Sequence, residues 1–200
     1  MSAAPVTERG RRTRDRLLEA ARAVFEERGF LETRVSDIAE RANVAIGTFY
    51  TYFDSKDAIF VALVDAFIAA LYEQSHVGEV AGPDPRQRIR TSNARFVEAF
   101  RRHGNLYGVI VQAASFNDEV RRRRLASRSV FIERATRGLR QLQAQGVADP
   151  TLDADVTAAL LCGMVENFVE RSHDLGLPFD DEAAVDAMTE IWARAIGLAP

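Results

Sequence analysis

The chain has 200 residues, of which 47% are hydrophobic, and 26 basic residues oppose 29 acidic ones for a formal net charge of −3. This is the composition of an ordinary globular protein, long enough to bury a core, and its longest apolar runs are too short to cross a bilayer. The single Cys162 excludes an internal disulfide, and Met1–Arg16 lacks the apolar segment of a secretory signal, so we expect a cytoplasmic protein.

The N-terminus is locally basic although the whole chain is slightly acidic. Five arginines between residues 9 and 16 stand against only Glu8 and Asp15, whereas acidic residues dominate from Arg171 to Pro200. An acidic tail can mask a basic N-terminus in the total, so the net charge does not exclude a partner such as DNA. Residues 1–12 are therefore predicted to be a flexible basic arm that is either solvated or in contact with DNA.

Helical periodicity predicts three short helices at the start of the chain. The expected ranges are Thr13–Arg28, about Val35–Ala42 and about Ala45–Phe53. Gly29 is expected to stop the first helix and Thr33 to cap the second, because these residue types favour helix ends. Between the second and third helices, Asn43 tolerates the left-handed conformation that a tight turn requires.

The same periodicity continues to the C-terminus, and no segment shows the alternation of a β-strand. A Gly- and Pro-rich stretch, His76–Pro85, is the clearest linker. Six longer helices are expected at Lys56–Gln74, Arg86–His103, Leu106–Ala114, Asp118–Gln145, Asp153–Leu175 and Asp181–Ile196. The predicted fold is all-α, with a three-helix domain at 13–55 and a six-helix bundle at 56–200.

Two short helices joined by a tight turn are able to place the second helix in the major groove of DNA. In Val35–Phe53 the residues Ile38, Val44, Phe49 and Phe53 would form the small core that holds these helices at their angle. Side chains suited to phosphate and base contact then remain near the exposed face, at Ile46, Thr48, Tyr50, Thr51 and Tyr52. Periodicity alone favours an ordinary helical hairpin that binds no nucleic acid.

The residues from Phe30 to Leu63 resemble the DNA-binding segment of TetR-family repressors. The matching elements, at fixed offsets, are Thr33, Asp37-Ile38-Ala39, Ala42, Val44, Gly47-Thr48, Tyr50, Tyr52-Phe53 and Lys56-Asp57. The specific resemblance covers about Thr13–Val64. It implies an N-terminal helix-turn-helix followed by a ligand-binding and dimerisation domain.

The resemblance also implies roles for individual residues. Phosphate contacts are implied for Thr48, Tyr50, Tyr52 and Lys56, the only lysine in the chain. Positions nearest to base edges are implied for Ser36, Ile46, Gly47 and Thr51. Arg34 and Ala45 complete the expected set of DNA contacts.

Two positions depart from the commonest family pattern. Asn43 stands where the turn usually has glycine, and Ala45 stands where serine or threonine would cap the recognition helix. Loss of such a cap typically costs about 1 kcal/mol of helix stability. Together with Ile46, Ala45 makes the start of this helix apolar, so base recognition is expected to use thymine methyl groups and DNA shape.

The C-terminal helices carry many large apolar residues on their predicted inner faces. Any single one is more simply explained as core, but together they suit a pocket for an apolar effector. The expected pocket residues are Phe67, Leu71, Phe96, Phe100, Tyr107, Val111, Gln112, Phe131, Met164, Asn167 and Phe168. Polar residues on the same faces either orient the effector or bond to helix ends or a dimer partner, and these are Asn105, Gln112, Glu166 and Asn167.

The last two helices carry an apolar stripe suited to self-association. The expected interface residues are Val156, Leu160, Gly163, Asn167, Met188, Ile191, Trp192 and Ala195. The resemblance implies that these helices pair with their two-fold mates, so that a homodimer presents two recognition helices to a pseudo-palindromic operator. Repression would end when an effector favours a spacing of these helices that does not fit the groove. Effector and DNA must then weaken each other's binding by the same factor.

An enzyme was the main alternative. Glu73/His76 and Glu170/His173 both have the Glu-x-x-His spacing that di-iron helical bundles use, although both pairs lie at the predicted ends of their helices. No catalytic triad pattern or phosphate-binding glycine loop is visible. A helical adaptor without DNA binding is a third possibility, which Tyr50, Tyr52 and Lys56 argue against. The sequence thus favours a DNA-binding regulator without catalytic residues, resident metal or cofactor.

Overall fold

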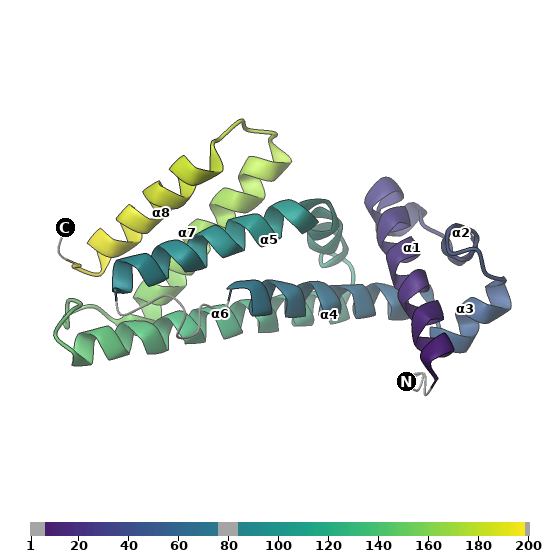
Figure 1. Ribbon diagram of the computed structural model, residues 1–200, viewed down its shortest axis with the longest axis horizontal. Helices are drawn as coiled ribbons and strands as arrows, with labels where there is room; N and C mark the ends of the chain where they lie inside the picture. The colour runs from purple at the N-terminus through teal and green to yellow at the C-terminus, as the bar shows by residue number, and fades with distance from the viewer. Residues whose placement is uncertain (1–6, 76–83, 199–200) are drawn as a thin grey trace. The chain divides into compact units, whose positions relative to one another are not determined.

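The computed structural model describes residues 7–75 and 84–198, which form eight α-helices and no strand (Figure 1). The helices are α1 (Glu8–Glu32), α2 (Val35–Arg41), α3 (Ile46–Tyr52), α4 (Lys56–Ser75), α5 (Pro85–Ala113), α6 (Asp118–Ala144), α7 (Ala154–Asp174) and α8 (Asp181–Ala195). The predicted all-α class is confirmed. No helix in these two described ranges is both long and apolar enough to span a membrane.

The chain divides into two compact units. The head unit consists of Met1–Ile68 and Asn105–Arg124, and the C-terminal unit consists of Ala69–Gly104 and Leu125–Pro200. The helices α4, α5 and α6 each supply residues to both units. Packing around the three N-terminal helices therefore extends beyond the predicted domain at 13–55, because it takes in the start of α4 and the corner between α5 and α6.

The first helix is longer at both ends than the sequence predicted. It begins at Glu8, where the Thr7 hydroxyl accepts a hydrogen bond from the Gly10 amide at 3.1 Å, so residues 8–12 are helical and the predicted flexible arm is wrong there. At the other end Gly29, with φ 74° and ψ 174°, interrupts the helix without ending it. The predicted N-cap role of Thr33 is also wrong, because its hydroxyl donates back to the Gly29 carbonyl at 2.7 Å.

An aromatic cluster forms the core of the head unit. The ring of Phe60 lies 4.8 Å, centroid to centroid, from the rings of both Phe25 and Phe30, in edge-to-face geometry. Phe116, from the corner between α5 and α6, lies 5.7 Å from Phe30. Such pairs add to the stabilisation that burial of the rings provides. The cluster therefore joins the end of α1 to α4 and to the corner.

The structure replaces two predicted helices by one. Arg86–His103 and Leu106–Ala114 are parts of the continuous helix α5, so five helices rather than six follow α3 in the described residues. A glycine inside a helix costs only about 1 kcal/mol relative to alanine, and Gly104 is buried by packing that offsets this cost. Local signals for a break at Gly104-Asn105 are thus overruled by tertiary contacts.

The C-terminal unit has its own apolar core. Leu139 and Leu142 of α6 and Leu161 of α7 pack with Ala193 and Ile196 near the chain end, and Trp192 packs against this cluster. Gly146, with φ 69°, turns the chain after α6, as the sequence predicted. The caps Asp153 and Asp180 accept hydrogen bonds from the first turns of α7 and α8.

Candidate nucleic-acid interface

The second and third helices form a helix-turn-helix with a small buried core. Ile38 of α2 and Phe49 of α3 are both fully buried, and Phe53 is 4% exposed. Ala39 is buried as well, so its small side chain permits close approach of the two helices. Val44 is half-buried. The core predicted from the sequence therefore forms, and it fixes the position of α3 against α2.

The turn between these helices has the predicted geometry. Asn43 has φ 51°, in the left-handed region that asparagine occupies more readily than other residues with a β-carbon. The next amide, that of Val44, donates to the Ala39 carbonyl at 3.0 Å. At the start of α2 the Asp37 carboxylate accepts from the Arg34 amide at 2.9 Å and pairs with Arg28 at 3.0 Å. Ala45 provides no side-chain cap for α3, as expected.

The outer face of α3 is open to solvent. Ile46 is 50% exposed and Tyr50 53% exposed. Of the other predicted DNA contacts, Arg34, Ser36, Ala45, Gly47 and Thr51 are exposed, whereas Thr48 and Tyr52 are half-buried. The Thr51 hydroxyl donates to the Gly47 carbonyl at 3.1 Å. The structure thus brings these predicted residues together on and around one short helix.

Lys56 has partners that the sequence did not reveal. Its ammonium donates to the carbonyls of Phe30 at 2.8 Å, Leu31 at 3.3 Å and Thr33 at 2.8 Å. It also lies 4.6 Å from the centre of the Phe30 ring. Because an ammonium has three N–H donors, these carbonyls occupy all of them. A phosphate contact by Lys56, as the sequence predicted, would therefore replace at least one of these bonds.

A salt bridge ties α2 to α1. The two terminal nitrogens of Arg41 donate to the two carboxylate oxygens of Glu27, at 2.9 and 2.6 Å. This hydrogen bond is the main reason that the pKa of Glu27 is lowered and that of Arg41 is raised. Both side chains are exposed, so the pair positions the helices more than it stabilises the fold.

The residues predicted to line an effector pocket divide between the two units. In the head unit, the rings of Phe67 and Tyr107 lie 5.8 Å apart. In the C-terminal unit, Phe96 and Phe131 lie 6.1 Å apart in edge-to-face geometry. The buried or half-buried members are Phe67, Leu71, Phe96, Phe100, Tyr107, Val111, Phe131, Met164 and Phe168.

Two polar residues predicted for the pocket do not point inward. Gln112 and Asn167 are both exposed, which favours their alternative role, contact with a helix end or a dimer partner. Glu166, another of the polar residues considered for this role, is half-buried on α7 and accepts a hydrogen bond from Arg128 at 2.7 Å. Burial raises the pKa of the nearby Cys162 thiol to about 11. Helical spacing alone could not identify Arg128, because it lies in a run of polar residues.

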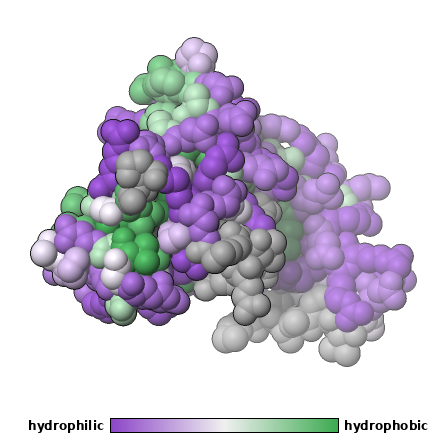
Figure 2. Space-filling view, turned by 60° about the vertical axis from the view of Figure 1, so that its left-hand side comes forward, coloured by the Kyte–Doolittle hydropathy of each residue, from purple (hydrophilic) through white to green (hydrophobic). Residues whose placement is uncertain are grey.

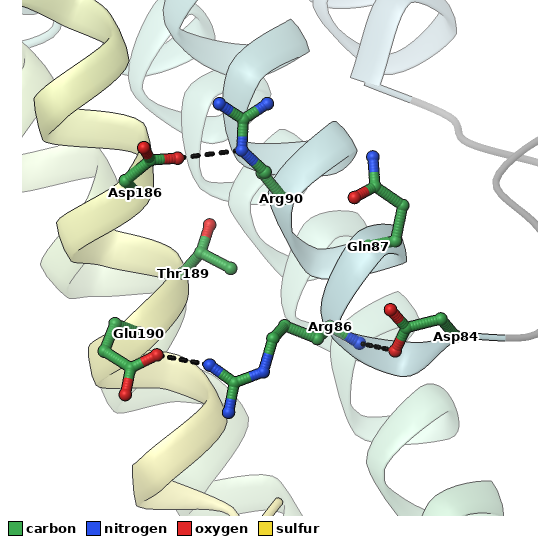
Figure 3. A pocket seen from close by; sticks show the side chains of 7 residues that line it. All are labelled: Asp84, Arg86, Gln87, Arg90, Asp186, Thr189 and Glu190. Carbon is green, nitrogen blue, oxygen red and sulfur yellow. Dashed lines mark hydrogen bonds and ion pairs between the residues drawn. The ribbon is translucent and has the colours of Figure 1, made fainter. Parts of the chain in front are cut away.

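A charged pocket of about 240 Å³ lies between α5 and α8 (Figure 3). Arg86 and Arg90 of α5 bind Glu190 and Asp186 of α8, the second pair at 2.8 Å, and Thr189 lies between them. The hydrogen bonds from Arg194 and Arg86 lower the pKa of Glu190. This pocket differs in chemistry from the predicted apolar one, and its ion pairs join the two helices.

The outer side of α7 and α8 carries exposed apolar residues. Val156 is 56%, Leu160 69% and Ile191 52% exposed. Figure 2 shows how apolar groups interrupt a mainly hydrophilic surface on the face that it displays. Met188, by contrast, is 4% exposed and Trp192 packs against the core, so the prediction that Met188 belongs to a dimer interface is wrong.

Two family models match the chain. The model described as bacterial regulatory proteins, tetR family, matches residues 17–63, which contain the helix-turn-helix. The model described as the C-terminal domain of the transcriptional regulator EthR matches residues 89–197, more than half of the chain. The chain belongs to the TetR family. It is a DNA-binding transcriptional regulator, and the resemblance inferred from the sequence is confirmed.

Relatives within the TetR family are named as repressors. The chain is 27% identical over 167 residues to the probable acrEF/envCD operon repressor of Escherichia coli K12, covering 80% of this chain and 76% of that protein. It is 30% identical over 112 residues to the repressor KstR of Mycobacterium tuberculosis, covering 56% of this chain and 51% of that protein.

Solved structures of TetR-type regulators have the same fold. The regulator FadR of Bacillus subtilis, in complex with stearoyl-CoA, superposes with a TM-score of 0.78 at 20% identity, covering 91% of this chain and 98% of that one. FadR of Bacillus halodurans superposes with a TM-score of 0.76 at 18% identity, covering 90% and 94%.

These relatives give no support to the metal-binding alternative. His76 and the side chains of Glu73 and His173 lie outside the described residues, which leaves Glu170 as the one described side chain of the two motifs. Among the described side chains, no group of three or more histidine, cysteine, aspartate or glutamate residues is placed to hold a metal ion. The relatives described above are named for transcription rather than for catalysis.

Proposed function

We propose that this TetR-family chain is a ligand-responsive repressor that binds a pseudo-palindromic operator as a homodimer and is released by a small apolar effector. One observation carries the proposal. The short helix α3 is anchored by the fully buried Phe49, while Ile46 and Tyr50 on its other side are about half exposed. A rigid helix with such an outer face suits insertion into a major groove, and we place this function in the cytoplasm, where bacterial DNA lies.

The contacts proposed for DNA fall into two groups. Ser36, Ile46, Gly47 and Thr51 lie exposed and are assigned to base edges, with the Ile46 side chain suited to a thymine methyl group. Arg34, Thr48, Tyr50 and Tyr52 are assigned to phosphates, which fix register without reading sequence. Ala45 lies exposed at the N-cap of α3 and is assigned to the same DNA-contacting surface.

The homodimer is proposed to form through α7 and α8. Members of the family act as dimers, and the exposed Val156, Leu160 and Ile191 offer apolar area that water contacts in a single chain. Burial of such area contributes about 25 cal/mol per Å². Gly163, Asn167 and Ala195 complete the proposed surface, with the small Gly163 permitting close approach.

The effector is proposed to be apolar because aromatic and aliphatic side chains dominate the inner faces. Phe96 and Phe131, with the half-buried Met164 and Phe168, are the part of this lining within the C-terminal unit. The Bacillus subtilis FadR, which has a similar fold, is found in complex with stearoyl-CoA, and this supports the proposal of an apolar effector. An effector that binds better to the state that cannot bind DNA weakens operator binding. The operator must then weaken effector binding by the same factor.

The experiment is a binding titration with DNA that flanks the protein's own coding region. Ile46→Ala is compared with Leu125→Ala, because Leu125 is 54% exposed but lies on α6. We expect Ile46→Ala to weaken specific binding by about tenfold and to change the preferred sequence, and Leu125→Ala to have no effect. Equal affinity of the wild-type protein for operator and unrelated DNA would contradict the proposal.

A further inference from the structure

Arg16, on the first helix, reaches the turn of the helix-turn-helix. Its guanidinium donates to the carbonyl of Ala42 at 2.5 Å and to that of Asn43 at 3.2 Å, which are 26 and 27 residues further along the chain. Ala42 is the C-cap of α2, and Asn43 is the residue with positive φ. The side chain of Arg16 thus holds the two consecutive carbonyls at which the chain changes direction between α2 and α3.

The Ala42 carbonyl is one that the end of α2 leaves without a donor, and the Asn43 carbonyl follows it in the turn. The last carbonyls of a helix have no partner within it, and they carry the partial negative charge of the helix dipole. A charged donor at this place satisfies them and also restrains the turn. The turn determines the angle between α2 and α3, and therefore the direction in which Ile46 and Tyr50 point.

Other cations of the head unit are similarly engaged within the protein. Arg12 pairs with Glu8, Arg22 with Glu26, Arg28 with Asp37 and Arg41 with Glu27, while Arg14 lies 5.3 Å above the ring of Phe53. The other arginines that the structure describes in residues 7–41 are Arg9, Arg11 and Arg34. Among the described residues, these three make no ion pair or ring contact of this kind, and they make no bond to a distant carbonyl like that of Arg16. The basic N-terminus therefore contains two classes of arginine, of which one is internal to the fold.

We propose that Arg16 is a positioning residue for DNA recognition, which sets the α2–α3 turn and makes no contact with phosphate. The proposal rests on operator binding by this head unit, and it gives the arginines two different roles. Arg9, Arg11 and Arg34 are available to neutralise phosphates, whereas Arg16 acts through the backbone of Ala42 and Asn43.

The salt dependence of operator affinity separates these roles. Each phosphate contact contributes about 0.9 to the slope of log affinity against log salt concentration. We expect Arg16→Ala to weaken operator binding by about tenfold while it leaves this slope unchanged. The matched control, Arg34→Ala, is expected to lower the slope by about 0.9. A lower slope for Arg16→Ala, or unchanged affinity, would overturn the proposal.

A second variant tests the same hydrogen bonds without removal of the charge. Lysine also donates to carbonyls, so Arg16→Lys should recover part of the affinity that Arg16→Ala loses. If Arg16 contacted a phosphate, Arg16→Ala would lower the slope and Arg16→Lys would restore it. We expect instead the same slope for both variants. Arg16 is exposed, so neither substitution opens the core.

Hydrogen exchange in the free protein makes the test independent of DNA. The amide of Val44 is bonded to the Ala39 carbonyl within the turn, so Arg16→Ala should accelerate its exchange by about tenfold. The amide of Ile59, bonded to Ser55 at the start of α4, is the internal control and should not change. If the wild-type protein binds no operator, the proposed function fails while this measurement still decides the role of Arg16. Unchanged exchange at Val44 would overturn the inference.

Discussion

The side-chain amide of Asn117 donates a hydrogen bond to the Asp57 carboxylate, with 2.9 Å between Nδ2 and Oδ1. The carbonyl oxygen of the same side chain accepts from the amides of Glu119 and Val120, each at 3.1 Å. One asparagine therefore caps α6 and joins its first turn to the first turn of α4. This joint lies next to Lys56, which holds the end of α1.

Substitution of Asn117 separates these two functions. Asn117→Ala removes the cap and the bond to Asp57, so we expect the free energy of unfolding to fall by about 1–2 kcal/mol. Asn117→Ser retains a capping oxygen and should recover about half of that loss. Urea denaturation measures both. A double-mutant cycle with Asp57→Ala gives the contribution of the bond itself, and a coupling of zero would show that it contributes nothing to stability.

The backbone conformation of Asn43 predicts that glycine and alanine at this position have different effects on stability. Glycine adopts φ 51° without strain, so Asn43→Gly should change the free energy of unfolding by less than about 1 kcal/mol. Asn43→Ala places an ordinary β-carbon in the left-handed region and should destabilise the protein by about 1–2 kcal/mol. Thermal denaturation of the two variants checks this, and equal melting temperatures would show that the turn relaxes.

The carbonyls around Lys56 predict a loss of stability when the ammonium is removed. Lys56→Met keeps an apolar stem against the Phe30 ring but leaves the carbonyls of Phe30, Leu31 and Thr33 without this donor. We expect the free energy of unfolding to fall by about 1–3 kcal/mol. Lys56→Arg, which keeps the charge, is the control. An unchanged denaturation midpoint for Lys56→Met would mean that water replaces the ammonium at no cost.

The most exposed apolar residue of α7 tests the dimer. Leu160→Glu would bury a charge in the proposed interface, so the dissociation constant of the dimer should be about a hundredfold higher than for the wild type. Leu125→Glu is a matched control on another helix, because Leu125 is also exposed. Analytical ultracentrifugation distinguishes them. Identical sedimentation of the two variants would remove α7 from the interface.

Cys162 predicts how the protein responds to alkaline pH. Burial raises the pKa of its thiol from 9.0 to about 11, so the folded chain keeps this proton where the unfolded chain releases it. The contribution of this group to stability is therefore complete below pH 9 and is lost as the pH rises toward 11. Alkylation by iodoacetamide at pH 9 should be much slower in the native protein than in urea. Equal rates would contradict this burial, and Cys162→Ala is the control for the stability profile.

Local signals in the sequence were sufficient for the helix-turn-helix. The spacing of Ile38, Ala39 and Phe49 predicts the buried face, and Asn43 marks the turn, because periodicity and backbone preference act over a few residues. The same local rules allowed the exposed positions Ile46 and Tyr50 to be anticipated, since side chains opposite a buried face must meet solvent.

Contacts between distant residues were decided by the tertiary structure alone. Lys56 meets Phe30, and Arg16 meets Ala42, across 26 residues in both cases, so no periodicity reveals either partner. The continuity of α5 through Gly104 and the burial of Met188 likewise depend on packing against other helices. Short-range preferences determined which segments are helical and which turn is tight, whereas the partner of each long polar side chain followed only from where the helices came together.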